Sequence, residues 1–135
     1  MIIPATRYRD PEAALLFLVG VLGLEEHAVF RDGDGNLIHA QLRLGNGLMM
    51  FGPKRDGGFD AHLIDPKETG GRETTTIYAV VPDVAERYAR VQDAEARVIM
   101  PLEEQEHGGV SFSVADPEGH IWTFGDYDPL AAPQG

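Results

Sequence analysis

The sequence predicts an α+β domain in which two tandem βαβββ modules form a curved mixed sheet around a cleft. The main observation is a repeat: a strand, a helix that starts at an aspartate, and a glycine-marked hairpin that ends in an apolar strand occur twice. The copies span residues 2–52 and 74–127, and a crossover loop, residues 53–73, joins them. With 135 residues the chain suffices for a single domain, residues 1–135, but hardly for two independently stable ones. Paired modules of this kind leave a cleft between their sheets, where a ligand site is expected.

The first module begins with an alternating strand over residues 2–8. Asp10 is a good N-cap and Pro11 suits the first helical turn, so a helix is expected over residues 11–21, with Gly23 beyond its end. Strands over 25–31, 37–44 and 48–52 follow. Glycine-rich turns separate these three strands, as in β-hairpins.

The second module repeats this order. We expect a strand over 74–81, a helix over 83–93, and strands over 97–101, 110–115 and 120–126, with a turn at 116–119 and a frayed tail after Asp128. The crossover is rich in Gly, Pro and Asp and contains Phe59. Because long loops in compact domains are often lids or binding loops, this segment is a candidate part of the site.

Composition limits the partners. The chain has 11 Lys and Arg and 22 Asp and Glu, a formal charge of −11, which disfavours nucleic acid and anionic membrane surfaces. There is no cysteine, so disulfides and thiolate metal sites are excluded. The longest apolar run, residues 13–24, is too short to span a bilayer and lacks the flanks of a signal peptide. We therefore expect a cytoplasmic protein.

Several motifs occur in an order that points to a family. They are Tyr8-Arg9-Asp10-Pro11, Val21-Leu22-Gly23-Leu24 and Asp116-Pro117-Glu118-Gly119. In this order they resemble the glyoxalase/bleomycin-resistance/extradiol-dioxygenase superfamily, also called vicinal oxygen chelate (VOC) proteins, over residues 2–127. The stretches 39–42 and 119–125 look most like its PhnB-like branch. The resemblance implies a homodimer with a ligand site on the concave sheet face, but no single reaction, since members include enzymes and noncatalytic drug-binding proteins.

The resemblance also implies where a metal would be held. Metal-dependent members carry four His, Gln or Glu ligands on the first and last strands of each module. The matching positions here are Ile3, Met50, Thr76 and Thr123, with Met49 or Ile77 if the register slips by one. These side chains cannot supply the anionic or imidazole ligands of a catalytic divalent ion. We therefore expect neither a metal nor another cofactor, and we assign no catalytic residue.

Without a metal, the cleft is interpreted as a pocket whose walls follow from strand alternation. The even-numbered apolar residues of 37–44, including Ile38, should face a helix, which leaves His39 and Gln41 for the cleft. Phe59 and Phe112 could close over the pocket. The predicted ligand-binding residues are Arg7, His39, Gln41, Met50, Phe59, Thr76, Tyr78, Phe112, Ile121 and Thr123. This mostly apolar set with a few polar groups suits a flat or hydrophobic organic ligand.

The same residues also have purely structural interpretations. Residues 49–51 are typical of core, His39 is typical of a solvated strand position, and residues 103–107 are typical of an exposed loop. Arg7 and Arg9 could simply pair with Asp10 or Glu12 at the surface. His120 has the parity that points away from the cleft.

The favoured function is metal-independent binding of a hydrophobic or aromatic small molecule by a homodimer, with an acidic rim that prefers cationic, antibiotic-like compounds. One alternative is an enzyme: a metal-dependent lyase, isomerase or dioxygenase with ligands relocated to His39, His62 or His107, or a metal-free catalyst that uses His39 with Tyr78 as acid and base. A second alternative is a structural or regulatory dimer whose cleft is filled by side chains.

Overall fold

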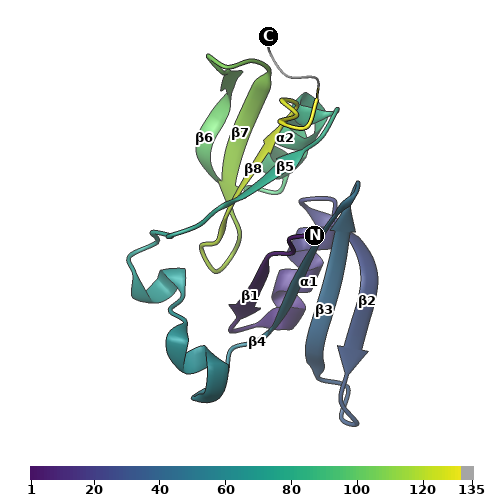
Figure 1. Ribbon diagram of the computed structural model, residues 1–135, viewed down its shortest axis with the longest axis vertical. Coiled ribbons are helices and arrows are strands. Elements are labelled where there is room, and N and C mark those ends of the chain that lie inside the picture. The colour runs from purple at the N-terminus through teal and green to yellow at the C-terminus, as the bar shows by residue number, and fades with distance from the viewer. Residues whose placement is uncertain (132–135) are drawn as a thin grey trace.

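The computed structural model describes residues 1–131. Figure 1 shows two similar modules joined by the long crossover. The first module comprises β1 (Ala5–Tyr8), α1 (Pro11–Gly20), β2 (Glu25–Arg31), β3 (Leu37–Leu44) and β4 (Gly47–Pro53). The crossover holds two 3₁₀ turns, η1 (Gly58–His62) and η2 (Pro66–Glu68). The second module comprises β5 (Ile77–Val80), α2 (Val84–Asp93), β6 (Arg97–Glu104), β7 (Val110–Ala115) and β8 (Ile121–Gly125).

The predicted fold class is confirmed. The sheets have the orders β1-β4-β3-β2 and β5-β8-β7-β6, which are the same order in the two modules. In each sheet the first and last strands of the module pair in parallel, and the other pairs are antiparallel. A helix covers one face of each sheet and leaves the other face open (Figure 1).

The start of α1 follows the expected capping chemistry. The Asp10 carboxylate accepts a hydrogen bond from the amide of Ala13 at 3.0 Å, and Pro11 occupies the first turn. At the equivalent place in the second module, Asp83 makes no cap bond. Its carboxylate instead binds Arg87 one turn later, at 2.8 Å. The two helices therefore start at equivalent aspartates that act differently.

Three strand boundaries differ from the predictions by three residues. β1 begins at Ala5 instead of residue 2, so Ile3 lies before the strand. β5 begins at Ile77 instead of residue 74, so Thr76 lies before the strand. β6 continues past Pro101 to Glu104, through two register shifts, and takes up part of the predicted loop 103–107. Pro101 is tolerated because β6 is an edge strand. Bulges and edge positions leave little trace in a hydrophobic pattern.

The prediction that Ile38 faces the helix is wrong. Phe30 pairs with His39 and Arg31 pairs with Leu37, so Ile38 is the extra residue of a β-bulge. The bulge breaks the alternation, buries Leu37 and leaves Ile38 exposed. Beyond the bulge, Ala40 and Leu42 are fully buried as expected.

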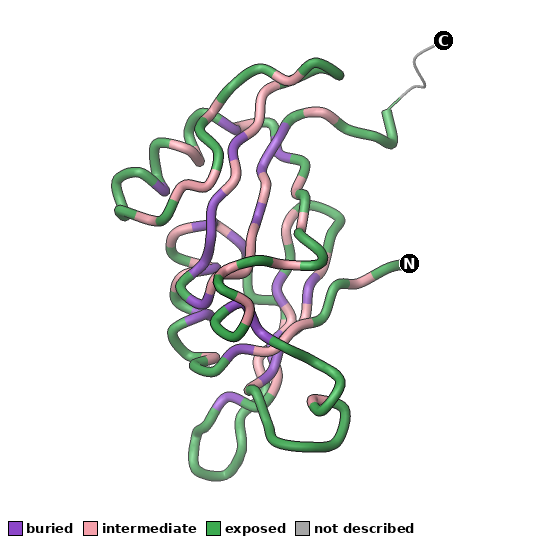
Figure 2. Tube along the Cα trace, turned by 90° about the vertical axis from the view of Figure 1, so that its left-hand side faces the viewer, coloured by how far each residue is buried: buried purple, intermediate pink, exposed green. Residues whose placement is uncertain are grey.

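One apolar cluster runs through both modules and connects the helices to the inner sheet faces. It includes Tyr8, Leu18 and Phe51 from the first module and Val91 and Phe112 from the second. Figure 2 shows the buried stretches along the strands and the inner sides of the helices, while most connecting segments are exposed. Burial of aromatic and aliphatic side chains of this size is the main stabilising contribution to such a fold.

A buried polar network also joins the modules. Asp116, in the turn between β7 and β8, accepts hydrogen bonds from the hydroxyl of Tyr8 and from Nε1 of Trp122. Glu118 accepts the backbone amides of Arg9 (2.6 Å) and Asp10 (2.8 Å). This turn therefore fixes the second module on the end of β1, and no buried side-chain nitrogen or oxygen in the described part lacks a partner.

Within residues 1–131, no helix is long and apolar enough to cross a membrane.

Candidate functional site

A cavity of about 570 Å³ lies on the open face of the first sheet. Arg7, His39, Met50 and Phe59, which are four of the predicted ligand-binding residues, line it together with Ile38. The register explains the sheet part, because Ala5, Met50, Gln41 and Ala28 form one row across β1, β4, β3 and β2. Met50 thus faces the cavity, whereas its neighbours Met49 and Phe51 are core residues. Met50 therefore fits the pocket interpretation of residues 49–51, while Met49 and Phe51 fit the core interpretation.

The crossover forms one wall of this cavity. Residues 55–60 line it, and Phe59 is 68% exposed at its rim. The guanidinium carbon of Arg7 lies 5.8 Å from the centre of the Phe59 ring, within range of a cation–π contact. Aromatic and charged groups therefore meet at the mouth of the cavity.

Asp60 connects that wall to β1. Its carboxylate accepts a hydrogen bond from the backbone amide of Arg55 at 2.8 Å and from Nε of Arg7 at 3.0 Å. These bonds, the amide first, lower the pKa of Asp60, against the opposing effect of burial. The surface pairing considered for Arg7 and Arg9 is wrong, since both arginines bind aspartates of the crossover, Asp60 and Asp65.

The opposite wall carries an imidazole. Nε2 of His39 lies 3.1 Å from the amide nitrogen of Gln41, and the His39 ring centre is 5.8 Å from that of Phe30. Phe30 is half exposed. The site thus presents aromatic rings, a thioether and an aliphatic side chain, with polar groups at the edges. This composition suits stacking of a planar organic molecule.

The second module has a cavity of its own, of about 300 Å³, on its open sheet face. Tyr78 and Thr123, two further predicted residues, line it with Met100, Ser113 and Tyr127. The Tyr78 hydroxyl donates to the carbonyl of Tyr127 at 2.7 Å, and burial, followed by the charge of Asp126, raises the pKa of Tyr78. The two cavities share no lining residue. Within one chain, the predicted set is therefore divided between two sites.

Four predicted residues line neither cavity. One of them, Gln41, lies beside His39 on the open sheet face. Phe112 is only 1% exposed and packs on Phe124 and on Tyr88 of α2, with ring centres 5.5 and 5.1 Å away, so the expectation that it closes over the cleft is wrong. Its parity places it on the helix face, and the neighbouring Ser111 and Ser113 face the cavity instead. Thr76, before β5, and Ile121, at the start of β8, line neither cavity.

The donor chemistry at the family's metal positions does not fit a catalytic ion. Ile3 has no donor atom, and Met50 offers only a thioether. The Thr123 hydroxyl shares a 2.6 Å hydrogen bond with Ser113, while Thr76 precedes its strand. Hard or borderline divalent ions need carboxylate or imidazole ligands at such sites. In residues 1–131 no group of three or more His, Cys, Asp or Glu side chains is placed to hold a metal ion.

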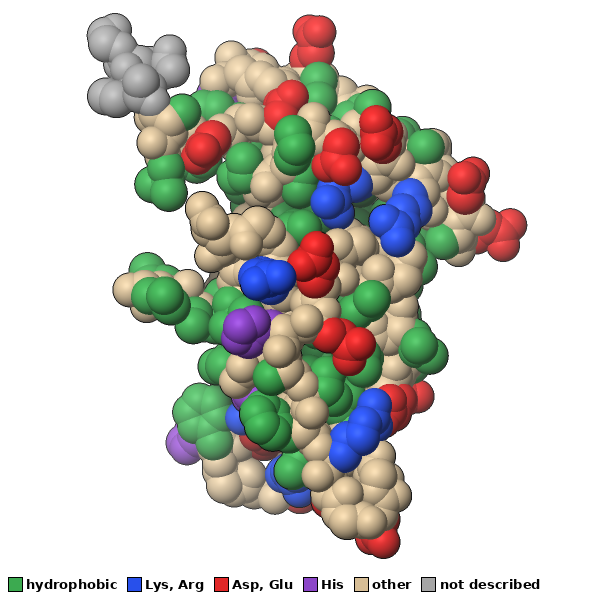
Figure 3. All heavy atoms as spheres, turned by 90° about the vertical axis from the view of Figure 1, so that its right-hand side faces the viewer, with side chains coloured by type: hydrophobic (Ala, Val, Ile, Leu, Met, Phe, Trp, Pro, Cys, Tyr) green, Lys and Arg blue, Asp and Glu red, His purple; other side chains and the backbone are tan. Residues whose placement is uncertain are grey.

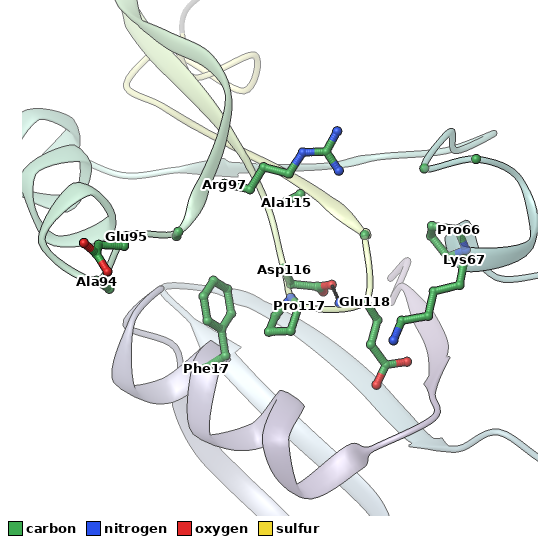
Figure 4. A pocket seen from close by; sticks show the side chains of 14 residues that line it. Phe17, Pro66, Lys67, Ala94, Glu95, Arg97, Ala115, Asp116, Pro117 and Glu118 are labelled. Atoms are coloured by element: carbon green, nitrogen blue, oxygen red, sulfur yellow. Dashed lines mark hydrogen bonds between the residues drawn. The ribbon is translucent and has the colours of Figure 1, made fainter.

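A larger hollow, of about 690 Å³, lies between the modules, where Phe17 of α1 faces the turn between β7 and β8 (Figure 4). Two buried carboxylates, Asp116 and Glu118, lie in its lining, but the Tyr8, Trp122 and backbone donors of the network above already engage them. Lys67 and Arg97 extend from separate segments (Figure 4). This hollow therefore lies where the two modules pack together, and its carboxylates are already engaged in holding them together.

Surface charge is mixed rather than concentrated. On the face shown in Figure 3, acidic side chains lie scattered with basic ones between them. At the first cavity, Arg7 and Arg55 balance Asp56 and Asp60. The formal charge of −11 therefore acts as a long-range potential and not as an acidic cavity wall.

Sequence reasoning missed the crossover residues on either side of Phe59. Gly57 and Gly58 have φ values of 75° and 59°, and they turn the chain so that Phe59 and Asp60 reach the cavity. The adjacent glycines were the available sign. Ile38 was missed because the bulge that exposes it has no clear sequence signature.

Comparison with known proteins gives a consistent result. The family described as "Glyoxalase/Bleomycin resistance protein/Dioxygenase superfamily" matches residues 4–124. An uncharacterized protein of Mycobacterium bovis (strain ATCC BAA-935 / AF2122/97) is 34% identical over an alignment of 119 residues. The alignment covers 86% of this chain and 76% of that protein. A protein of Mycobacterium tuberculosis (strain ATCC 25618 / H37Rv), likewise uncharacterized, has the same identity and covers 86% of this chain and 68% of its own length.

Among solved structures, TioX from Micromonospora sp. ML1 is 26% identical with a TM-score of 0.74, covering 98% of this chain and 99% of its own. Lactoylglutathione lyase from Agrobacterium tumefaciens shares the fold at 19% identity and a TM-score of 0.60, covering 93% and 91% of the two chains.

Proposed function

Because this chain belongs to the glyoxalase/bleomycin resistance protein/dioxygenase superfamily, we propose that it is a metal-independent binding protein for a hydrophobic or aromatic small molecule. The superfamily includes catalysts as well as binding proteins, so membership alone does not decide between them. The proposal rests on the chemistry of the residues at the site.

The observation that carries the proposal is that the metal-ligating residues of the family are replaced here by residues of other types. At the family's metal positions stand a hydrocarbon, a thioether and two hydroxyls (Ile3, Met50, Thr76 and Thr123), and around Met50 the cavity collects His39, Ile38 and Phe59. A site whose metal positions hold no carboxylate or imidazole, and whose walls include apolar and aromatic side chains, stabilises a ligand by burial and stacking. Binding alone is then the mechanism, and sequestration requires only affinity and abundance.

The preferred ligand is cationic or neutral rather than anionic. The cavity wall itself is balanced in charge, but the formal charge of −11 raises the local concentration of cations near any open site. This preference should weaken as salt is added, because added ions screen exposed charges beyond about 10 Å at 0.1 M.

We also propose that the protein acts as a homodimer whose clefts are shared between subunits. The open sheet face of each module carries a partial cavity. Four large apolar side chains are exposed on the single chain: Ile2, Val80, Met100 and Leu130. A twofold dimer that brings the first sheet of one subunit toward the second sheet of the other would cover such surface and enclose a ligand. Sedimentation equilibrium tests this directly, and a monomer at micromolar concentration would contradict it.

The test of binding uses three tricyclic molecules of similar size and different charge: proflavine (cationic), acridone (neutral) and anthracene-9-carboxylate (anionic). We expect proflavine and acridone to bind with micromolar dissociation constants and to raise the melting temperature. His39→Ala and Phe59→Ala should each weaken binding about tenfold. Leu16→Ala, at a 74% exposed position on α1, should have no effect. If none of the three binds, or if Leu16→Ala weakens binding as much as the site variants do, the proposal is wrong.

One observation favours the enzyme alternative. His39 and Gln41 are within hydrogen-bond distance on the open sheet face, next to Met50, and both residue types bind metals in this family. Elemental analysis of protein purified without added metal or chelator separates the two functions. About one ion per chain, lost in His39→Ala, would support relocated ligands and contradict metal-independent binding. His39 and Tyr78, the pair considered for acid and base catalysis, line different cavities of one chain.

A further inference from the structure

Residues 57–64 of the crossover, here called the lid segment, have an unusual combination of apolar side chains and exposure. Phe59 is 68%, Leu63 42% and Ile64 63% exposed, and no residue of η1 is buried. Apolar side chains grouped on a short exposed segment usually cover something in another state of the molecule. The segment lies directly at the rim of the first cavity, which Gly57, Gly58, Phe59 and Asp60 help to line.

The N-terminal end of the lid segment is a two-glycine joint. Gly57 and Gly58 both have positive φ, and a β-carbon at either position would meet no atom within 4 Å. Glycine is therefore present for its backbone freedom and not because space is short. Such a joint can change its dihedral angles without disturbing neighbouring side chains.

The C-terminal end is fixed. Asp65, which follows the segment, binds Arg9 at 2.8 Å and Lys54 at 2.8 Å, and its side chain is 9% exposed. The lid segment thus runs from a glycine joint, where a β-carbon would meet no neighbouring atom, to an anchored residue.

A single side chain holds the segment against the sheet. Asp60 binds Nε of Arg7 and the amide of Arg55, and its side chain is 7% exposed. Among residues 1–131, no other side-chain hydrogen bond joins the lid segment to the rest of the chain. We call these two bonds of Asp60 the latch. Because the latch is next to Phe59, it keeps the exposed ring beside the cavity before any ligand arrives.

From this geometry we propose that the lid segment is a ligand-operated lid: it turns about Gly57 and Gly58 and places Phe59 over an aromatic molecule in the first cavity, while the Asp60 latch holds it in reach. This inference rests on the proposed binding function. The ring gains stacking contact with the ligand. Closure therefore depends on an occupied cavity.

Trypsin offers a direct readout, since Arg55 is exposed just before the joint and Arg72 is exposed beyond the anchor. Saturation with proflavine should slow cleavage after Arg55 at least tenfold and leave cleavage after Arg72 unchanged. Phe59→Ala should cancel that protection even at proflavine concentrations high enough to saturate the variant. Fluorescence titration in the same samples establishes independently whether proflavine is bound.

The latch is tested without ligand. At a temperature well below the melting transition of each variant, Asp60→Asn should speed cleavage after Arg55 about fivefold, whereas Asp93→Asn, at an exposed position on α2, should not. Equal cleavage rates in Asp60→Asn and the unmodified protein would overturn the latch.

The outcomes with ligand separate the lid from the binding function. Bound proflavine with unchanged cleavage after Arg55 overturns the lid and leaves the binding function standing. Protection of Arg55 that is equally strong without ligand and disappears on dilution to monomer means that a second subunit covers the segment, which also overturns the lid. Failure of proflavine and of the other tricyclics to bind removes the proposed function, and the lid with it.

Discussion

Replacing Tyr8 by Phe should lower the melting temperature by about 5 to 10 °C, because it removes one bond of the network that joins the modules. Tyr8 has no exposed surface, and its hydroxyl donates to the carboxylate of Asp116, which is itself 4% exposed. A hydrogen bond to a charged group contributes about 1.5 to 3 kcal/mol. Asp116 keeps Trp122 Nε1 at 3.2 Å on the same oxygen. The variant therefore leaves no unsatisfied oxygen, and the loss should not exceed about 3 kcal/mol.

The conversion to temperature follows from chain length. An unfolding entropy of about 2.1 cal/mol/K per residue makes each kcal/mol of lost stability worth about 3.5 °C in a chain of 135 residues. Differential scanning calorimetry at pH 7 is the assay. The matched control is Tyr88→Phe, which removes the same hydroxyl from a half-buried tyrosine that packs on Phe112. No hydrogen bond of the Tyr88 hydroxyl is seen within residues 1–131.

A shift below about 2 °C for Tyr8→Phe, or an equal shift for both variants, would refute the reasoning. Either result would mean that shape complementarity, and not the bond to Asp116, fixes β1 on the turn between β7 and β8. A double-mutant cycle with Asp116→Asn then measures the coupling between the two side chains.

Three further outcomes follow from the same contacts. Burial, followed by the charge of Asp116, raises the pKa of Tyr8 well above 10, so the folded state keeps a proton that the unfolded state releases. The stability that Tyr8 contributes should be complete below about pH 10 and should fall above it. Urea titrations at about pH 8 to 11 should show a smaller fall in Tyr8→Phe. Hydrogen bonds from Arg9, then Lys54, hold the pKa of Asp65 well below its usual range, so the stability that this group contributes is present above about pH 4 and lost below it. Because both cations are partly exposed, Asp65→Asn should cost about 1 kcal/mol of unfolding free energy at pH 7. The melting temperature of this variant should also fall less steeply as the pH is lowered. Phe112→Ala should cost about 3 to 5 kcal/mol in urea unfolding and leave proflavine affinity unchanged in fluorescence titrations below the transition, whereas Met50→Ala should do the reverse.

The fold was predictable because its signals are local and occur twice. Asp10 and Pro11 fix a helix start by capping chemistry alone, and the glycine turns fix the hairpins. The repeat then supplies the pairing of the modules, which no single motif would give. Membership in the PhnB-like branch stays a prediction, since the family match extends to the superfamily.

The site was predictable only where strand parity holds. Parity correctly separated Met50 from the core residues Met49 and Phe51, because β4 pairs regularly with β3. Parity failed at Ile38, where a bulge shifts the register. Phe112 was placed at the cleft because it is aromatic, although its parity in the strand points toward α2. Bulges and the path of a glycine-rich crossover depend on tertiary contacts, so they cannot be recovered from periodicity.

The division of the predicted residues between two cavities has a physical consequence for the protein's chemistry. Ligand groups that the family uses from both modules must come together for catalysis, yet in this chain Met50 and Thr123 lie in separate cavities and neither is a strong donor. Bringing the two sheets together in a dimer would shorten that separation but would not change the donor atoms. The proposed dimer would therefore enclose an aromatic ligand between Phe59 and a second sheet, and the residues at the metal positions would still offer no carboxylate or imidazole ligand.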